Sequence, residues 1–217
     1  MIRSIIFDLD GTLVHSLPGL ARALNRVLQK HKLPTHPEAV VRGFIGDGIK
    51  KLVERACPAD YSDEQIQLIE QDMVKAYADT WQTGSPPFTG IIETLDQLKK
   101  RGIPLAIFSN KPHHFCQEFA EFLFPGTFMV VIGQREGVPV KPDPTGALET
   151  AALLGIPAED TAFVGDSTMD IATAHNAGML ALAATWGYHN QDRLEKEHPH
   201  HLLHDITELI PLLESLN

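Results

Sequence analysis

Short apolar runs and helical patterns alternate along two parts of the chain. Apolar runs that end in polar residues or glycine predict buried β-strands. The predicted strands are residues 3–9, 103–108, 128–132, 161–165 and 180–184. Apolar residues spaced three or four apart predict helices over residues 91–98, 115–122, 143–154 and 171–177, and Asp205 is expected to cap a last helix that continues to Leu213. Strands that alternate with helices predict an α/β fold built on a doubly wound parallel sheet.

The segment between the first two predicted strands is helical throughout. Its apolar residues recur at helical spacing over residues 20–33 and 49–56. Ser62 and Gln65 form the pattern of a capping box, in which each side chain accepts from the other residue's backbone N–H. Connections that contain Pro and Gly bound the segment on both sides. We therefore expect two domains, an α/β core of residues 1–15 and 86–217 and an inserted all-helical domain of residues 16–85.

Composition and charge limit the kinds of partner. With 217 residues, of which 43% are hydrophobic and 21% charged, the chain has the composition of a globular protein with a substantial core. No apolar run reaches the ~18 residues of a membrane span. The N-terminal stretch MIRSIIFDLDG lacks the apolar core of a signal peptide, so we expect a cytoplasmic protein. The formal net charge of -10 argues against a nucleic-acid-binding surface, but it is compatible with a small anionic substrate beside a metal ion or a lysine.

Polar residues gather at the carboxyl ends of the predicted strands, where parallel α/β sheets bind their ligands. The first strand ends in the two acids of DLDGT, residues 8–12, which a glycine turn follows. The other candidates are Ser109 and Asn110 after the second strand, Lys141 in the stretch VKPDP, and Asp166 and Asp170 after the fourth strand. We expect these side chains to converge on one crevice.

Such a mixture of side chains suits phosphate chemistry. Clustered carboxylates repel one another unless a cation neutralises them, and Mg²⁺ prefers hard oxygen ligands. A lysine, a serine hydroxyl and backbone N–H groups suit the oxygens of a phosphate. One carboxylate near the phosphorus can attack it and form an aspartyl-phosphate. A neighbouring carboxyl can protonate the leaving oxygen and then activate water.

These residues resemble the ordered motifs of the haloacid dehalogenase superfamily, in its phosphatase branch. DLDGT (residues 8–12) resembles the first motif, Ser109 the second, Lys141 the third and GDSTMD (residues 165–170) the fourth. The helical insert falls where this family places its cap, so the resemblance implies a Rossmann-like core with a helical cap domain. The stretches SNKPHHF, VKPDP and TWGYHN are most similar to the phosphoglycolate phosphatase group. One departure is His15, at a position where that group usually carries an acid.

The resemblance also implies a role for each candidate residue. Asp8 is expected to be the nucleophile and a metal ligand. Asp10 is expected to be the general acid and base and to touch the metal through its main-chain carbonyl, while Asp166 is the second carboxylate ligand. Asp170 would hold either a metal-bound water or the Lys141 ammonium. The groups expected to bind phosphate are the side chains of Ser109 and Lys141, aided by Thr12 and by the backbone of Gly11 and Asn110.

The implied function is a Mg²⁺-dependent phosphatase acting on a small phosphorylated metabolite, 2-phosphoglycolate first, as a monomer or homodimer that binds neither nucleic acid nor membrane. Two alternatives stay open. One is a phosphosugar mutase of the same superfamily, which would also use Asp8 and Asp10. The other is a non-catalytic protein that binds a phosphometabolite. The loop GFIGDG, with Arg42 before it, is expected to reach the substrate, and the tract HPHHLLH (residues 198–204) is interpreted as a solvated loop.

Overall fold

The computed structural model describes residues 1–216, which divide into two compact units. The first unit joins residues 1–13 to the chain from Pro87 onward, and the second comprises Val14–Pro86. The chain therefore enters the second unit soon after its first strand and leaves it at a proline.

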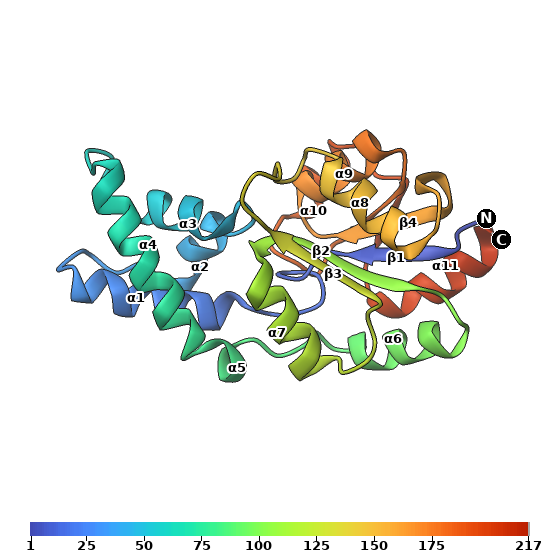
Figure 1. Cartoon of the computed structure of the whole chain (residues 1–217), viewed down its shortest axis with the longest axis horizontal. Helices are drawn as coiled ribbons and strands as arrows, with labels where there is room; N and C mark the ends of the chain where they lie inside the picture. The colour runs from blue at the N-terminus through green and yellow to red at the C-terminus, as the bar shows by residue number, and fades with distance from the viewer. Residues whose placement is uncertain (217) are drawn as a thin grey trace. The chain divides into compact units, whose positions relative to one another are not determined.

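A six-stranded parallel sheet forms the centre of the first unit (Figure 1). Its strands are β1 (Ser4–Phe7), β2 (Leu105–Pro112), β3 (Val130–Gln134), β4 (Thr161–Gly165), β5 (Leu180–Ala184) and β6 (His201–Leu203). They lie side by side in the order β3-β2-β1-β4-β5-β6, and every neighbouring pair is parallel. The α/β fold with a doubly wound parallel sheet, which the sequence predicts, is confirmed.

Helices cover both faces of this sheet, as Figure 1 shows. On one face lie α8 (Thr145–Leu154) and α9 (Thr168–Ala177), and on the other lie α6 (Ile91–Lys100), α7 (His113–Leu123) and α11 (Leu209–Leu216). The shorter elements are η2 (Ala158–Asp160), α10 (Gln191–Glu195) and η3 (Ile206–Glu208). Because both faces are buried, the central strands are continuous apolar runs, and this is why their sequences reveal them.

Small residues let α8 and α9 pack closely against the sheet. The rings of Phe108 and Phe163 stand on this face and meet edge to face, with their centroids 6.3 Å apart. A Cβ atom on Gly146 of α8 would lie 2.4 Å from the Phe108 ring, so no side chain fits there. α8 and α9 end at Gly155 and Gly178, both in the left-handed backbone conformation that favours glycine.

Two interpretations of the sequence differ from the structure. β2 does not end at Phe108 but continues to Pro112, with a shift of its register against β3 between these residues. The tract 198–204 is not a solvated loop throughout, because His201–Leu203 form β6 and pair with β5. A strand of three residues is too short to show a period, and the histidines around it conceal Leu203, which is only 2% exposed.

The second unit consists of helices. Its elements are α1 (Leu17–Lys30), α2 (Glu38–Val41), η1 (Arg42–Phe44), α3 (Gly48–Ala56), α4 (Asp63–Ala78) and α5 (Trp81–Gly84), and residues 14–86, all of them described, contain no strand. The capping box at the start of α4 is confirmed: the Gln65 N–H donates to Ser62 Oγ (3.4 Å), and the Ser62 N–H donates to Gln65 Oε1 (2.8 Å). Among residues 1–216, neither unit has a helix with the length and apolarity of a membrane span.

The contact between α1 and α5 predicts a loss of stability in one glycine variant. A Cβ atom on Gly84 would lie 2.6 Å from Gly19 Cα and 3.0 Å from Gly19 N, and backbone atoms cannot rotate away. We expect Gly84→Ala to force these helices apart and to lower the free energy of unfolding by about 1–3 kcal/mol, the usual effect of overpacking. Urea denaturation followed by circular dichroism measures the change.

Gly43→Ala is the matched control in the same unit, because nothing lies within 4 Å of its Cβ position. It should change the free energy of unfolding by about 0.5 kcal/mol or less. Equal effects of the two variants would contradict a tight contact at Gly84.

Candidate active site

The strand order places the candidate residues at one point of the sheet. β2 and β3 lie on one side of β1, whereas β4, β5 and β6 lie on its other side. In an open α/β sheet, such a reversal leaves a crevice beyond the carboxyl ends of the strands, and ligands bind there. Asp8 directly follows β1 and Asp166 directly follows β4, so both carboxylates stand at this crevice.

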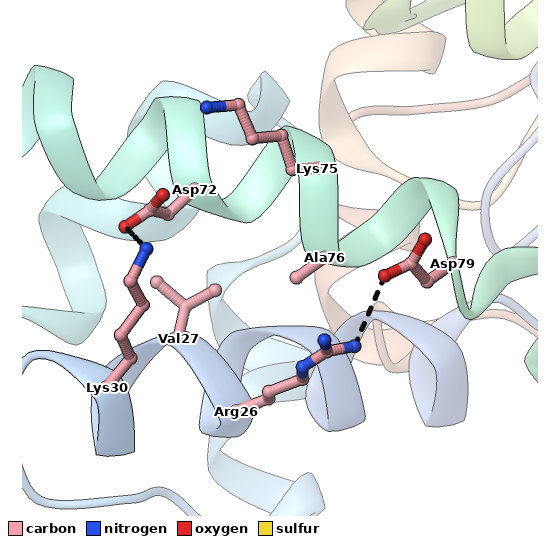
Figure 2. Close-up of a pocket in the computed structure, with 7 residues that line it drawn as sticks. All are labelled: Arg26, Val27, Lys30, Asp72, Lys75, Ala76 and Asp79. Carbon is pink, nitrogen blue, oxygen red and sulfur yellow. Dashed lines mark hydrogen bonds and ion pairs between the residues drawn. The ribbon is translucent and has the colours of Figure 1, made fainter.

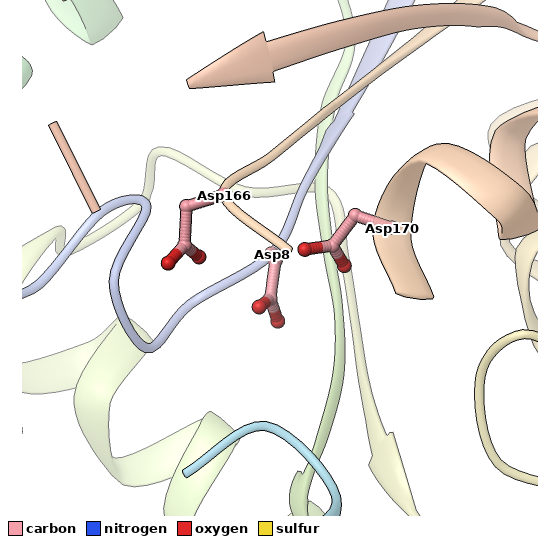
Figure 3. A group of neighbouring side chains, drawn as sticks. All are labelled: Asp8, Asp166 and Asp170. Atoms are coloured by element: carbon pink, nitrogen blue, oxygen red, sulfur yellow. The ribbon is translucent and has the colours of Figure 1, made fainter. Parts of the chain in front are cut away.

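Three buried carboxylates meet at the crevice, as Figure 3 shows. Carboxylate oxygens of Asp8, Asp166 and Asp170, one from each residue, lie within 4.8 Å of one another. The three residues are 7%, 2% and 1% exposed. Carboxylate oxygens at this spacing, largely shielded from water, could hold one hard cation. We call these residues the carboxylate cluster; the side chain of Asp10 does not belong to it.

The ammonium of Lys141 supplies positive charge to the carboxylate cluster. Its Nζ lies 2.6 Å from Asp170 Oδ1 and 2.9 Å from Asp8 Oδ1, and its side chain is 2% exposed. The rings of Phe108 and Phe163 lie close by, with centroids 5.9 and 5.8 Å from Nζ. Burial disfavours the charged amine, but Asp170 and Asp8 outweigh burial and raise the pKa of Lys141. Lys141 is therefore a fixed positive charge.

Burial raises the pKa of both carboxyl groups that follow the strands. The pKa of Asp8 rises from 3.8 to about 6, because desolvation outweighs the attraction of Lys141 and Asp170 adds repulsion. The pKa of Asp166 also rises well above its usual value, through burial first and then through the charges of Asp170 and Asp8. Lys141 alone thus leaves part of the negative charge of the cluster unbalanced.

Two turns hold Asp166 from both sides. Thr12 Oγ1 donates to its Oδ1 (3.0 Å), and the Tyr188 N–H donates to its Oδ2 (2.6 Å). A Cβ atom would lie 2.3 Å from Asp166 Oδ2 if placed on Gly11, and 2.2 Å from Asp166 Cβ if placed on Gly187. Gly11 also has a φ of 84°, which other residues rarely adopt. The Thr12 hydroxyl, which the resemblance assigns to phosphate, therefore contacts a carboxylate of the cluster.

The loop after β5 braces the turn after β1. Trp186 Nε1 donates to the Thr12 carbonyl (3.0 Å), and His189 Nδ1 accepts from the Thr168 N–H at the start of α9 (3.1 Å). Trp186 therefore positions the turn after β1, a role that the sequence analysis does not assign to it. The available signal was the stretch TWGYHN after a strand, which does not say which backbone group the indole reaches.

Asp170 caps α9 and holds Lys141 at the same time. Its Oδ2 accepts from the Ser167 N–H (2.9 Å) and from Ser167 Oγ (2.6 Å), while its own N–H donates to Ser167 Oγ (3.3 Å). Its Oδ1 accepts from Lys141 Nζ. Of the two contacts considered for Asp170, the structure contains the one with the ammonium.

The second half of β2 contributes two more polar residues. A hydrogen bond joins Ser109 to Asp8 and favours the ionised form of this carboxyl. Asn110 Oδ1 accepts from the Lys141 N–H (2.9 Å). Ser109 therefore lies beside the nucleophile candidate, and the Asn110 side chain fixes the backbone from which the ammonium projects.

Asp10 lies apart from the carboxylate cluster, against a lysine that the sequence did not single out. Lys111 Nζ is 3.0 Å from both carboxylate oxygens of Asp10, and the lysine side chain is 3% exposed. A signal did exist. Lys111 follows Ser109 by two residues, so both point to the same face if the strand continues through them. The sequence predicts that this strand ends at Phe108, so it does not place Lys111 on the same face as Ser109.

A second hollow lies on the helical unit between α1 and α4, as Figure 2 shows. Its volume is about 360 Å³, and its lining residues are Arg26, Val27, Lys30, Asp72, Lys75, Ala76 and Asp79. Two ion pairs cross it, from Lys30 Nζ to Asp72 Oδ2 (2.7 Å) and from Arg26 Nη1 to Asp79 Oδ2 (3.3 Å). Each pair has an exposed member, and such pairs contribute only about 0–1 kcal/mol. This groove is a seam between helices, and it does not compete with the crevice as the active site.

Comparison with known proteins identifies the class that this fold and this site define. Residues 5–184 match the family of haloacid dehalogenase-like hydrolases. The chain belongs to this family, so the resemblance drawn from its four motifs is confirmed.

Its relatives include phosphoglycolate phosphatases of two bacteria. The protein of Pectobacterium atrosepticum is 35% identical over 216 residues, which cover 98% of this chain and 92% of the relative. That of Yersinia pseudotuberculosis is 37% identical over 216 residues, which cover 98% and 93%. A crystal structure from Haemophilus somnus, described as a "predicted phosphoglycolate phosphatase", has a TM-score of 0.90 at 28% identity and covers 98% of both chains. The similarity therefore spans both units.

The raised pKa of Asp8 predicts how the stability of the metal-free protein depends on pH. Folded, Asp8 keeps its proton up to about pH 6; unfolded, it loses the proton near pH 3.8. Because the folded state keeps this proton in the window, the contribution of Asp8 to the free energy of unfolding falls as the pH rises from about 4 to above 6. In EDTA at pH 7.5, we therefore expect Asp8→Asn to be more stable than the wild type by about 1–3 kcal/mol.

Urea denaturation of both proteins between pH 4 and pH 8 measures this difference. The advantage of Asp8→Asn should be largest above pH 7 and should nearly vanish at pH 4, where the wild-type carboxyl is protonated in the folded state. An Asp8→Asn protein that is less stable at pH 7.5 would show that the ion pair with Lys141 outweighs the burial of the carboxylate.

Proposed function

We propose that this chain hydrolyses 2-phosphoglycolate with the help of Mg²⁺ and forms an aspartyl-phosphate on Asp8. Its family and its relatives make it a phosphoric monoester hydrolase. The observation that carries the mechanism is the position of Asp8, a buried carboxylate at the switch point of the sheet, 2.9 Å from the Lys141 ammonium. Lys141 and Ser109 contact this carboxylate where water would otherwise solvate it, and a positioned, poorly hydrated carboxylate suits a nucleophile.

The charges of the site support a divalent cation. Asp8, Asp166 and Asp170 carry three negative charges when ionised, and Lys141 offsets one of them. The two that remain equal the charge of one Mg²⁺, and Mg²⁺ prefers oxygen ligands. Asp8 and Asp166 would hold the ion, with the main-chain carbonyl of Asp10, whereas the oxygens of Asp170 already accept from Lys141 and Ser167. Bound there, the ion would withdraw negative charge from the phosphoryl oxygens.

Different residues of the chain would perform different parts of the proposed reaction. In the first step, an Asp8 oxygen attacks the phosphorus, the bond from phosphorus to the ester oxygen breaks, and the Asp10 carboxyl gives its proton to that oxygen. In the second step, the Asp10 carboxylate takes a proton from water, the water oxygen attacks the phosphorus, and the bond from phosphorus to Asp8 breaks. Lys141 and Ser109 would bind phosphoryl oxygens, so that an anion can approach Asp8.

The choice of substrate rests on the relatives and on the helical unit. The two bacterial relatives named above are phosphoglycolate phosphatases, and the match covers the helical unit as well. We propose that this unit is the cap that selects the substrate through the loop of residues 43–48 and through Arg42. Gly46 and Gly48 give this loop a backbone with φ of 122° and 85°. A guanidinium there would suit the carboxylate that phosphoglycolate carries beside its phosphate.

Metal binding can be tested by stability instead of turnover. For the wild type, we expect Mg²⁺ at 100 times its dissociation constant to raise the free energy of unfolding by about 2.7 kcal/mol relative to EDTA. Asp166→Asn should lose most of this increment, because it removes one charge of the carboxylate cluster. Thermal unfolding over a series of Mg²⁺ concentrations measures the increment.

Asp10→Asn is the matched control for metal binding. Its side chain lies against Lys111, outside the carboxylate cluster, and the variant keeps the main-chain carbonyl. It should therefore keep the wild-type increment. Loss of the increment in both variants, or in neither, would contradict the assigned ligands.

Catalysis can be tested by phosphate release from a panel of phosphorylated metabolites in Mg²⁺ and in EDTA. We expect 2-phosphoglycolate to be the best substrate in Mg²⁺, and Asp8→Asn to lower kcat by at least about 10³-fold, because an amide cannot replace the nucleophile. Asp96→Asn, at an exposed position of α6, is the matched control and should keep the wild-type rate.

The products decide between the remaining readings. Phosphate release mainly from other esters would be compatible with the proposed mechanism but would contradict 2-phosphoglycolate as the substrate. An isomerised sugar phosphate in place of free phosphate would favour a mutase. No turnover of any ester by the wild type in Mg²⁺ would contradict the phosphatase itself.

A further inference from the structure

Lys111 is a buried lysine that the proposed reaction does not use. Its single ammonium lies 3.0 Å from Asp10 Oδ1 and 3.0 Å from Asp10 Oδ2, so it holds both oxygens of the carboxylate. The ring of Phe119 is also near, with its centroid 4.7 Å from Nζ. A buried ammonium needs a counter-charge, and the breaking of such a pair is strongly destabilising. The contact is therefore a built part of the site.

The backbone that carries this ammonium is anchored as well. The Lys111 carbonyl accepts from Cys116 Sγ (3.5 Å), and a Cβ atom on Gly133 of β3 would lie 2.5 Å from the same carbonyl. The Lys111 N–H donates to Ser109 Oγ (3.4 Å). A buried side chain on a fixed backbone has few places for its Nζ, so the carboxylate that it holds is fixed too.

The Asp10 carboxylate has a second possible partner besides Lys111, which is the proposed cation. Asp10 lies two residues after Asp8 in the chain, and Asp8 belongs to the carboxylate cluster that would hold a divalent cation. A carboxylate within reach of such a cation can become a ligand of it, because Mg²⁺ prefers oxygen ligands. Asp10 bound in this way could not exchange a proton with the leaving oxygen and with water. In the structure the Lys111 ammonium holds this carboxylate instead, outside the carboxylate cluster.

We infer that Lys111 is a positioning residue for Asp10: it holds the carboxyl of the general acid in one orientation, apart from the metal ligands. This inference rests on the proposed role of Asp10. It requires that Lys111 act only where Asp10 acts, which is on esters whose leaving oxygen needs a proton.

A double-mutant cycle on two kinds of ester tests this inference. The variants are Lys111→Met, Asp10→Asn and the combination of the two, with Lys100→Met at an exposed position of α6 as the matched control. The substrates are the alkyl phosphate that the wild type hydrolyses best and 4-nitrophenyl phosphate, whose leaving group departs without a proton. The quantity compared is kcat/KM, which reports the steps up to departure of the leaving group.

We expect Lys111→Met to lower kcat/KM for the alkyl ester by about 10-fold to 100-fold, part of the usual contribution of a general acid. For 4-nitrophenyl phosphate the loss should be less than about threefold. The double variant should match Asp10→Asn, because residues that act through one group are not additive. The Mg²⁺ increment in stability should be at least as large as in the wild type, since a positive charge has been removed near the ion.

Equal losses on both esters, additive losses in the double variant, or a lost Mg²⁺ increment would overturn the inference. If Asp10→Asn lowered the alkyl-ester value and Lys111→Met did not, the inference alone would fall. If Asp10→Asn left that value unchanged, the proposed role of Asp10 would fall, and the inference with it.

Discussion

The ion pairs of Lys141 are the interaction on which the rest of the site depends. Three carboxylates lie together away from water, and each would otherwise be protonated or would oppose folding. The ammonium between Asp8 and Asp170 offsets part of this repulsion, and its own burial is offset by the same two groups. Asn110 and Asp170 hold this lysine, and Ser167 holds Asp170. The strands bring the acids together, and a charge from a different loop reduces the repulsion between them.

The second constraint is the close packing of the backbone against the acids, which requires glycine at several positions. The turn with Gly11 and the loop with Gly187 press on Asp166, while Gly165 leaves room for Asp170, whose Cβ would lie 2.3 Å from an added Cβ atom. Carboxylates this close to the main chain can accept from its N–H groups, as Asp166 does from Tyr188. The glycines thus let the backbone replace the water that burial removes, and they orient the acids before any ligand arrives.

The sequence predicted the fold and the positions of the acids because both depend on local patterns. Buried strands are apolar runs, and a polar residue after such a run stands at the ligand edge of a parallel sheet. Side-chain partners across the sheet follow no such pattern. From the sequence alone, the Thr12 hydroxyl could contact either a phosphate or Asp166. The packing of the surrounding loops determines that it contacts Asp166. Lys111 was missed because β2 continues past an irregular stretch, and β6 was missed because three residues show no period.

Two buried lysines form ion pairs with different acids of the site. Lys141 holds Asp8 and Asp170, and Lys111 holds Asp10, so that with Asp166 two negative charges stay unbalanced. A phosphate monoester adds further negative charge, and two unit charges 4 Å apart repel by about 4 kcal/mol at an effective dielectric constant of 20. This repulsion supports the proposal that a cation binds before an anionic substrate approaches Asp8. The same balance fits the role proposed for Asp10: its carboxyl lies against Lys111, outside the carboxylate cluster, so a proton transfer to or from it would remove no ligand from the proposed ion.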